Sequence, residues 1–104
     1  MAARKQLAEV KIGPVTVPLK IGPKACSSTG LHGEATTDPN PEIRLASLET
    51  HWDYIVMFHE CIHLISDFYE LNFPEDTVRT LDQAITQLLM DNPKLVSGML
   101  GEGS

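Results

Sequence analysis

The sequence predicts an α+β fold in which a small, mostly antiparallel sheet packs on two helices. Residues 1–46 contain short runs rich in β-branched residues, and glycines and prolines separate these runs. After about Leu48, apolar residues recur at helical spacing in two segments. The 104 residues suffice for one domain. We therefore expect a single domain over residues 1–95 and a flexible, Gly-rich C-terminal tail over residues 96–104.

The amino-terminal part predicts a hairpin followed by two short strands. Strands are expected near residues 7–12 and 15–21, because VTVPLKI alternates and Gly13-Pro14 marks a turn. Pro18 favours an edge or bulged position for the second strand, since proline cannot donate a hydrogen bond to the ladder. Two more strands are expected in LHGEATT and EIRLA, with the turn DPNP between them.

The segment MFHECIHLISDFYE, residues 57–70, predicts the central helix of the fold. Its apolar side chains cover one half of a helical wheel, and His59, Glu60 and His63 lie on the opposite, polar half. A second helix is expected from about Pro74 to Met90, with acidic residues in its first turn that complement the helix dipole. Its expected apolar stripe consists of Val78, Leu81, Ile85, Leu88 and Leu89.

Composition restricts the classes of function. The net charge of -6 argues against nucleic acid as a partner, because phosphate binding needs a basic surface. The sequence has no apolar run of about 18 residues and no signal peptide, so we expect a cytoplasmic protein that does not enter a membrane. Cys26 and Cys61 are expected to be free thiols, with Cys61 on the apolar side of the central helix.

His59-Glu60-Cys61-Ile62-His63 has the HExxH spacing that is typical of a zinc-peptidase helix. Side chains four residues apart lie next to each other on a helix, with Cβ atoms about 5–6 Å apart, so both imidazoles can bind one Zn²⁺ ion. Glu60 lies at the edge of the same face, where it can act as general base on a zinc-activated water. The competing interpretation is a solvated face with two incidental histidines.

The order of short strands, HExxH helix, loop and second helix resembles the small gluzincin-like metallopeptidase domains of phages and bacteria. The segments that carry this resemblance are HGEATTDPNPEIRLA, HECIHLISDFYEL and VRTLDQAITQLLMDNPKL, between about Leu31 and Leu95. The resemblance implies a zincin-like fold, zinc as cofactor and a peptide or protein as substrate. It also implies that the substrate lies along Glu42–Leu45, as the strand at the sheet edge.

The third metal ligand stays open at this point. Gluzincins supply a glutamate from the second helix, at a position where this chain has Arg79, and arginine cannot bind zinc. Asp82, one turn further along, is the favoured candidate, because a carboxylate beside an apolar stripe needs a partner. A structural pair with Arg79 is the alternative role for Asp82. The remaining candidate ligands are Asp67, Glu70, His51 and His32.

We therefore expect a small zinc-dependent metallopeptidase that hydrolyses peptide bonds, with His59, His63 and Asp82 as metal ligands and Glu60 as general base. The alternative is a catalytically weak or inactive zincin fold that serves as a binding or regulatory module, since so short a chain has little second lobe to enclose a substrate. A third interpretation is an interaction domain without metal. The sequence does not predict the substrate, the oligomeric state or the native metal.

Overall fold

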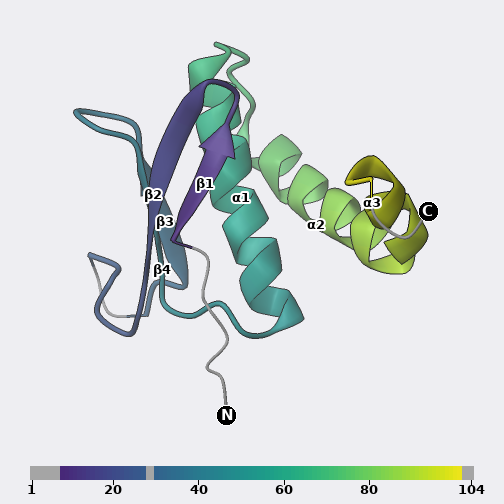
Figure 1. The fold of residues 1–104 in the computed structure, drawn as a ribbon. Coiled ribbons are helices and arrows are strands. Elements are labelled where there is room, and N and C mark those ends of the chain that lie inside the picture. Colours follow the sequence, from purple (N-terminus) through teal and green to yellow (C-terminus); the bar gives the residue numbers. More distant parts are fainter. Residues whose placement is uncertain (1–7, 28–29, 102–104) are drawn as a thin grey trace.

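The computed structural model describes residues 8–27 and 30–101, and its fold is α+β, as predicted. The elements follow in the order β1 (Glu9–Ile12), β2 (Val15–Ile21), β3 (Gly33–Thr36), β4 (Glu42–Leu45), α1 (His51–Phe68), α2 (Glu75–Asp91) and α3 (Pro93–Met99). Helix α1 lies between the sheet and α2, and α3 packs at the far end of α2 (Figure 1). The fold therefore has three layers, of which α1 is the middle one.

The described strands form one mixed sheet in the order β1-β2-β4-β3. The β1–β2 hairpin turns at Gly13, whose φ of 58° lies in the left-handed region that favours glycine. Strand β4 pairs with β2 in parallel and with β3 in antiparallel orientation, with Leu19 opposite Ile43 and Gly33 opposite Leu45. The predicted hairpin and both later strands are thus confirmed.

Two predictions about the edges of this sheet are wrong. Strand β4, Glu42–Leu45, lies between β2 and β3, so the edge beside α1 belongs to β3. Strand β2 is also internal, although it contains Pro18. Its pairing with β4 starts only at Leu19, so Pro18 stands just before that ladder and its missing N–H interrupts no bond within it.

The core lies between the sheet and the apolar half of α1. Its largest fully buried side chains are Val17, Ile43, Leu45, Leu64 and Val78. The alternation of β4 directs Ile43 and Leu45 towards α1, while Glu42 and Arg44 lie on the opposite face of the sheet. There the Arg44 guanidinium pairs with Glu34 at 3.0 Å and with Glu42 at 2.6 Å.

The helices begin and end at recognisable signals. Thr50 caps α1 in a capping box with Asp53, which satisfies backbone N–H groups of the first turn. Helix α2 has the predicted extent and ends before Pro93, which opens α3. The segment expected to form a tail therefore starts as a helix that runs to Met99. Within the described residues, no helix combines the length and apolar character that crossing a membrane requires.

The buried face of α2 is rotated from its predicted apolar stripe, and Val78 belongs to both. Its buried residues are Val78, Asp82 and Thr86, whereas Leu88 is 52% exposed. The Thr86 hydroxyl donates a hydrogen bond to the carbonyl of Asp82 at 2.6 Å. The buried side of α2 therefore includes polar residues, and one of them, Asp82, belongs to the candidate site.

Candidate metal centre

His59 and His63 lie one turn apart on the side of α1 that faces α2. Both are half-buried, their ring centroids are 4.7 Å apart, and their Nε2 atoms are separated by 3.1 Å. The sequence places them on the polar half of α1, and the structure covers that half with α2. This face of α1 is therefore partly covered by α2 and is not a fully solvated surface.

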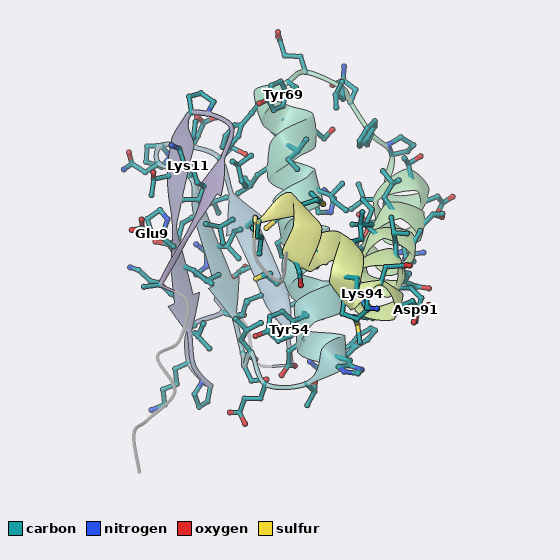
Figure 2. All side chains as sticks on the ribbon, turned by 45° about the vertical axis from the view of Figure 1, so that its right-hand side comes forward. Glu9, Lys11, Tyr54, Tyr69, Asp91 and Lys94 are labelled. Carbon is teal, nitrogen blue, oxygen red and sulfur yellow. The ribbon has the colours of Figure 1, made fainter. Side chains whose placement is uncertain are left out.

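The loop between α1 and α2 brings the first residue of α2 back to these histidines. Tyr54 and Tyr69 mark the two ends of α1 in Figure 2, and the loop starts beside Tyr69. Ser66, which is buried, fixes the turn: its carbonyl accepts from the N–H of Leu71 and its hydroxyl from the N–H of Phe73. Glu70 and Asn72 adopt left-handed backbone conformations, which reverse the chain within few residues.

Glu75, the first residue of α2, faces both imidazoles. Its carboxylate oxygens lie 3.1 Å from Nε2 of His59 and 2.9 Å from Nε2 of His63. In the part of the chain that the structure describes, His59, His63 and Glu75 form the group whose ligand atoms all lie within 4.8 Å of one another. The sequence analysis assigned Glu75 only to the helix dipole. Its position one turn before Arg79 and two turns before Asp82 was the available signal for a role in the site.

Asp82 lies against His59, but at the other ring nitrogen. Its Oδ2 is 2.5 Å from Nδ1 of His59, while Nε2 of that ring faces His63 and Glu75. Asp82 is 3% exposed, and its second oxygen, Oδ1, has no hydrogen-bond partner among the described residues. The structure thus brings Asp82 into the site, as the sequence predicts, yet outside the group of converging ligand atoms.

The contacts of His59 decide which of its nitrogens carries a proton. Oδ2 of Asp82 is an acceptor, so Nδ1 of His59 is the donor in that contact, and a neutral ring then has a lone pair at Nε2. That lone pair faces a carboxylate oxygen of Glu75, which is also an acceptor. Two facing acceptors need a cation or an extra proton between them. The donor set therefore fits a bound cation.

The spacing of the donor atoms suits zinc. Ligands at about 2.0–2.1 Å from a tetrahedral Zn²⁺ ion stand roughly 3.3 Å apart. The three contacts among His59, His63 and Glu75 measure between 2.9 and 3.1 Å. Two imidazoles and one carboxylate are a ligand set that catalytic zinc sites use. Asp82 would then be the carboxylate that holds a ligating imidazole by its other nitrogen.

Glu60 lies next to His59 and is buried, at 9% exposure. Burial raises the pKa of its carboxyl group, and the neighbouring imidazoles of His59 and His63 oppose that rise. Cys61, the next residue, points into the core, where burial raises the pKa of its thiol to about 11. Glu60 therefore lines the cleft as a carboxyl group with a raised pKa, and Cys61 lies in the core, as predicted.

A cleft of about 290 Å³ adjoins His59 along α1. Its walls come from the start of β3, the first half of α1 and the middle of α2. The lining residues are His32, Gly33, Trp52, Ile55, Val56, His59, Glu60, Arg79, Asp82 and Gln83. Arg79 has its guanidinium 3.7 Å from Glu75 and 3.8 Å from Asp76, and its pairing with Asp82 is not observed among the described contacts.

The other candidate ligands lie outside the group. Asp67 accepts a hydrogen bond from the Thr37 hydroxyl at 2.6 Å. Glu70 is exposed in the loop after α1, and His51 is exposed at the first position of α1. His32 packs edge-on against Trp52 at the cleft, with ring centroids 6.3 Å apart. Both cysteines are free, as expected.

Comparisons with family models, with curated proteins and with solved structures found no significant match to this chain. The functional interpretation therefore depends on the geometry of the site.

Proposed function

We propose that this chain is a small zinc-dependent metallopeptidase, with His59, His63 and Glu75 as metal ligands. The observation that carries the proposal is that two Nε2 atoms from the HExxH helix and the carboxylate of Glu75, the first residue of α2, lie 2.9–3.1 Å from one another. Glu75 takes the place that the sequence analysis gave to Asp82. A zinc ion in such a site polarises a carbonyl group and lowers the pKa of a water molecule.

Asp82 acts on His59 as a positioning residue. Its contact with Nδ1 fixes the ring orientation and keeps the lone pair on the nitrogen that faces Glu75 and His63. Asp82 is only 3% exposed, so water has little access to its contact with His59.

Glu60 is the general base of the proposed reaction. It lines the cleft beside His59, and its burial raises the pKa of its carboxyl group, so it takes up a proton more readily than an exposed glutamate does. It accepts a proton from water during the attack on the peptide carbonyl and delivers it to the leaving amine. A purely structural metal site needs no such residue.

The proposal is tested by metal content and peptidase activity in four proteins: the parent chain and the variants His63→Ala, Glu75→Gln and Glu60→Gln. Elemental analysis after zinc addition and desalting should find zinc in the parent and in Glu60→Gln, but not in His63→Ala. Glu75→Gln should bind zinc more weakly. Against a quenched-fluorescence peptide library, Glu60→Gln should lose at least about 10²-fold in activity while it keeps its zinc.

The outcomes separate the competing functions. A parent that binds no zinc overturns the metal centre and favours an interaction domain. Zinc binding with no hydrolysis of any library peptide, and with no difference between the parent and Glu60→Gln, favours the inactive zincin fold that binds peptides or regulates a partner. Zinc that survives Glu75→Gln unchanged removes Glu75 as a ligand.

A further inference from the structure

The outer edge of strand β1 carries backbone groups that the described sheet does not use. Strand β1 is the last strand of that sheet, at the end away from β3. The carbonyl of Ala8 accepts a hydrogen bond at 2.9 Å from the N–H of Leu19, the residue opposite to it. Hydrogen-bonded pairs alternate along an antiparallel ladder, so Val10 also bonds to β2, whereas Glu9 and Lys11 direct their N–H and C=O groups away from β2. These two residues therefore offer two donors and two acceptors to a further strand.

The side chains of β1 separate onto the two faces of the sheet. Val10 and Ile12 face α1, where Ile12 belongs to the core and Val10 packs against it. Glu9 and Lys11 are exposed on the opposite face, away from the helices (Figure 2). A strand added at this edge would therefore meet an apolar side chain on the face of α1 and one charge of each sign on the other face.

The charges of β1 are complementary to those of a second copy of the same strand. Two antiparallel copies are related by a two-fold axis, and their outward backbone groups meet only when the axis passes Glu9, Val10 or Lys11. An axis at Glu9 would place two glutamates opposite each other, and an axis at Lys11 would place two lysines so. With the axis at Val10, Glu9 of each copy lies opposite Lys11 of the other. Opposite charges stabilise a strand pair and like charges destabilise it, so the sequence selects the axis at Val10.

Apolar side chains of α1 lie on the same side of the molecule as this edge. Val56 marks the side of α1 that faces β3, because its Cγ1 is the nearest atom to a Cβ built on Gly33. At about 100° per residue, Tyr54, Phe58 and Ile65 stand roughly 160–200° around the helix from Val56, so they face the β1 end of the sheet. Tyr54 is 38% exposed, and the other two are partly buried. A second copy paired through β1 would bring these side chains towards their counterparts, so burial of apolar surface would add to the strand pairing.

We propose that the outer edge of β1 is an interface between two copies of this chain, which pair their β1 strands in antiparallel orientation about a two-fold axis at Val10. This pairing joins the two sheets into one, with both α1 helices on the same face. A two-fold contact is closed, because each copy uses the same edge, so it yields a dimer. The interface lies at the opposite end of the sheet from β3 and does not depend on the proposed metal centre.

The first test is analytical ultracentrifugation of the full chain from micromolar to millimolar concentration, where the parent should show a monomer–dimer equilibrium. Lys11→Glu and Glu9→Lys each turn both attractive pairs into repulsive ones, and each should raise the dissociation constant of the dimer about 10- to 100-fold. Lys94→Glu and Asp91→Lys are the matched controls, because they make the same changes in charge at exposed positions of α3 and of the end of α2. Both controls should keep the dissociation constant of the parent.

Charge exchange tests the register. An equimolar mixture of the Lys11→Glu and Glu9→Lys chains should form a heterodimer about as tight as the parent dimer, because every glutamate of the edge again meets a lysine. Both substitutions in one chain should restore the homodimer for the same reason. Thermal unfolding shows that the single variants are folded. A parent that stays monomeric at millimolar concentration would overturn the proposal and leave the edge to solvent or to a strand of another protein. A dimer that both single variants keep, or a mixture that recovers no dimer, would also overturn it.

The second test locates the interface by hydrogen exchange, measured by NMR on dilute and concentrated samples of the parent. The amides of Glu9 and Lys11 should exchange at least about tenfold more slowly in the dimer, because the second copy accepts their hydrogen bonds. The amide of Val10 is the internal control: it bonds to β2 in both states and should change less. Equal exchange of the Glu9 and Lys11 amides in monomer and dimer would overturn the pairing through β1.

Discussion

Asp82 contacts His59 at Nδ1, and through this contact it determines which ring nitrogen faces Glu75 and His63. A metal ligand and a residue that positions a ligand differ in how metal affinity responds to their loss. Removal of a ligand abolishes the site or reduces its coordination number. Removal of the positioning carboxylate leaves every ligand present, but the orientation of the His59 imidazole is no longer fixed.

We expect Asp82→Asn to weaken zinc binding by about 10- to 100-fold and not to abolish it, because the amide can still contact the ring but carries no charge. A competition titration with a chromogenic zinc chelator measures this affinity directly. Asp91→Asn, an exposed aspartate at the end of α2, is the control and should bind zinc as the parent does. Complete loss of zinc in Asp82→Asn would make Asp82 a ligand, as the sequence analysis first proposed.

Glu34 is the residue whose ionisation contributes most clearly to stability. The Arg44 guanidinium, together with the backbone and hydroxyl of Ser27, lowers the pKa of Glu34 to about 2 from the ordinary value of 4.5. A carboxyl group with a lowered pKa in the folded state stabilises the protein above its unfolded pKa. This contribution should therefore be present above pH 4.5 and disappear as the pH falls towards 2.

We expect Glu34→Gln to lower the free energy of unfolding at pH 7 by about 1–2 kcal/mol, a range that allows for partial exposure and solvent screening. The difference in the free energy of unfolding between parent and variant should become smaller as the pH falls from 4.5 to 2. Urea unfolding at pH 7, 4.5 and 2.5 measures it, with Glu9→Gln, an exposed glutamate of β1, as control. If this difference in the free energy of unfolding does not change with pH, packing and not charge accounts for the lower stability of Glu34→Gln.

At the scale of elements, the start of β3 is held close to α1 by a glycine. A Cβ atom at Gly33 would lie 2.6 Å from Cγ1 of Val56 and 3.0 Å from Cδ2 of Leu45, so one of the elements would have to move. Strand β3 is also the edge strand beside the cleft. Its position therefore affects both stability and the shape of the candidate site.

We expect Gly33→Ala to destabilise the fold by about 1–3 kcal/mol through overpacking, and urea unfolding measures the change. Val56→Ala in the same chain should recover part of this loss, because it removes the nearest atom. Gly98→Ala in α3 is the control: its Cβ atom meets nothing within 4 Å, so alanine should be neutral or stabilise the helix by up to about 1 kcal/mol. Equal effects at the two positions would contradict the close approach of β3 to α1.

The elements that the sequence predicted well are those with local signals. Gly13 places the hairpin turn, and Asn92-Pro93 ends α2, because their backbone preferences act within a few residues. The parallel pairing of β2 with β4 joins segments more than twenty residues apart, so no local pattern indicates it. Glu75 was missed for a related reason. Its contact with the histidines depends on the turn that Ser66 fixes, and a helical wheel does not contain that turn.

The burial of α2 also differs from its hydrophobic pattern. An apolar stripe predicts the buried face when a helix packs on an apolar surface. Here the opposing surface of α1 carries His59 and His63, so α2 turns Asp82 and Thr86 inward and leaves Leu88 exposed. The sequence pattern thus places His59 and His63 on the face of α1 that meets α2, whereas the apolar stripe of α2 does not predict that Asp82 and Thr86 are buried against it.

At the scale of the whole molecule, α2 and α3 form an arm that meets the rest of the fold through α1. Among the helices and strands, α2 contacts α1 and α3, and it has no comparable contact with the sheet (Figure 1). The arm is joined to α1 at a surface with three carboxyl groups, from Glu60, Glu75 and Asp82, in a chain of net charge -6. A bound cation would neutralise part of this charge and connect the arm to α1 at the same point.

We therefore expect zinc to stabilise the arm more than the sheet. Zinc at a hundredfold excess over its dissociation constant stabilises the native state by about 2.7 kcal/mol. The segment that the metal ion holds in place should therefore open about 100-fold less often. Hydrogen exchange should slow by about this factor for amides of α2, and it should not slow for sheet amides that exchange through openings smaller than unfolding of the whole domain. Exchange is measured by NMR with zinc and with a chelator. Glu75→Gln should remove most of the difference, because Glu75 is the proposed ligand that belongs to the arm. Equal slowing of those sheet amides would contradict an arm that opens separately, and unchanged exchange in α2 would contradict a metal ion that joins α1 to α2.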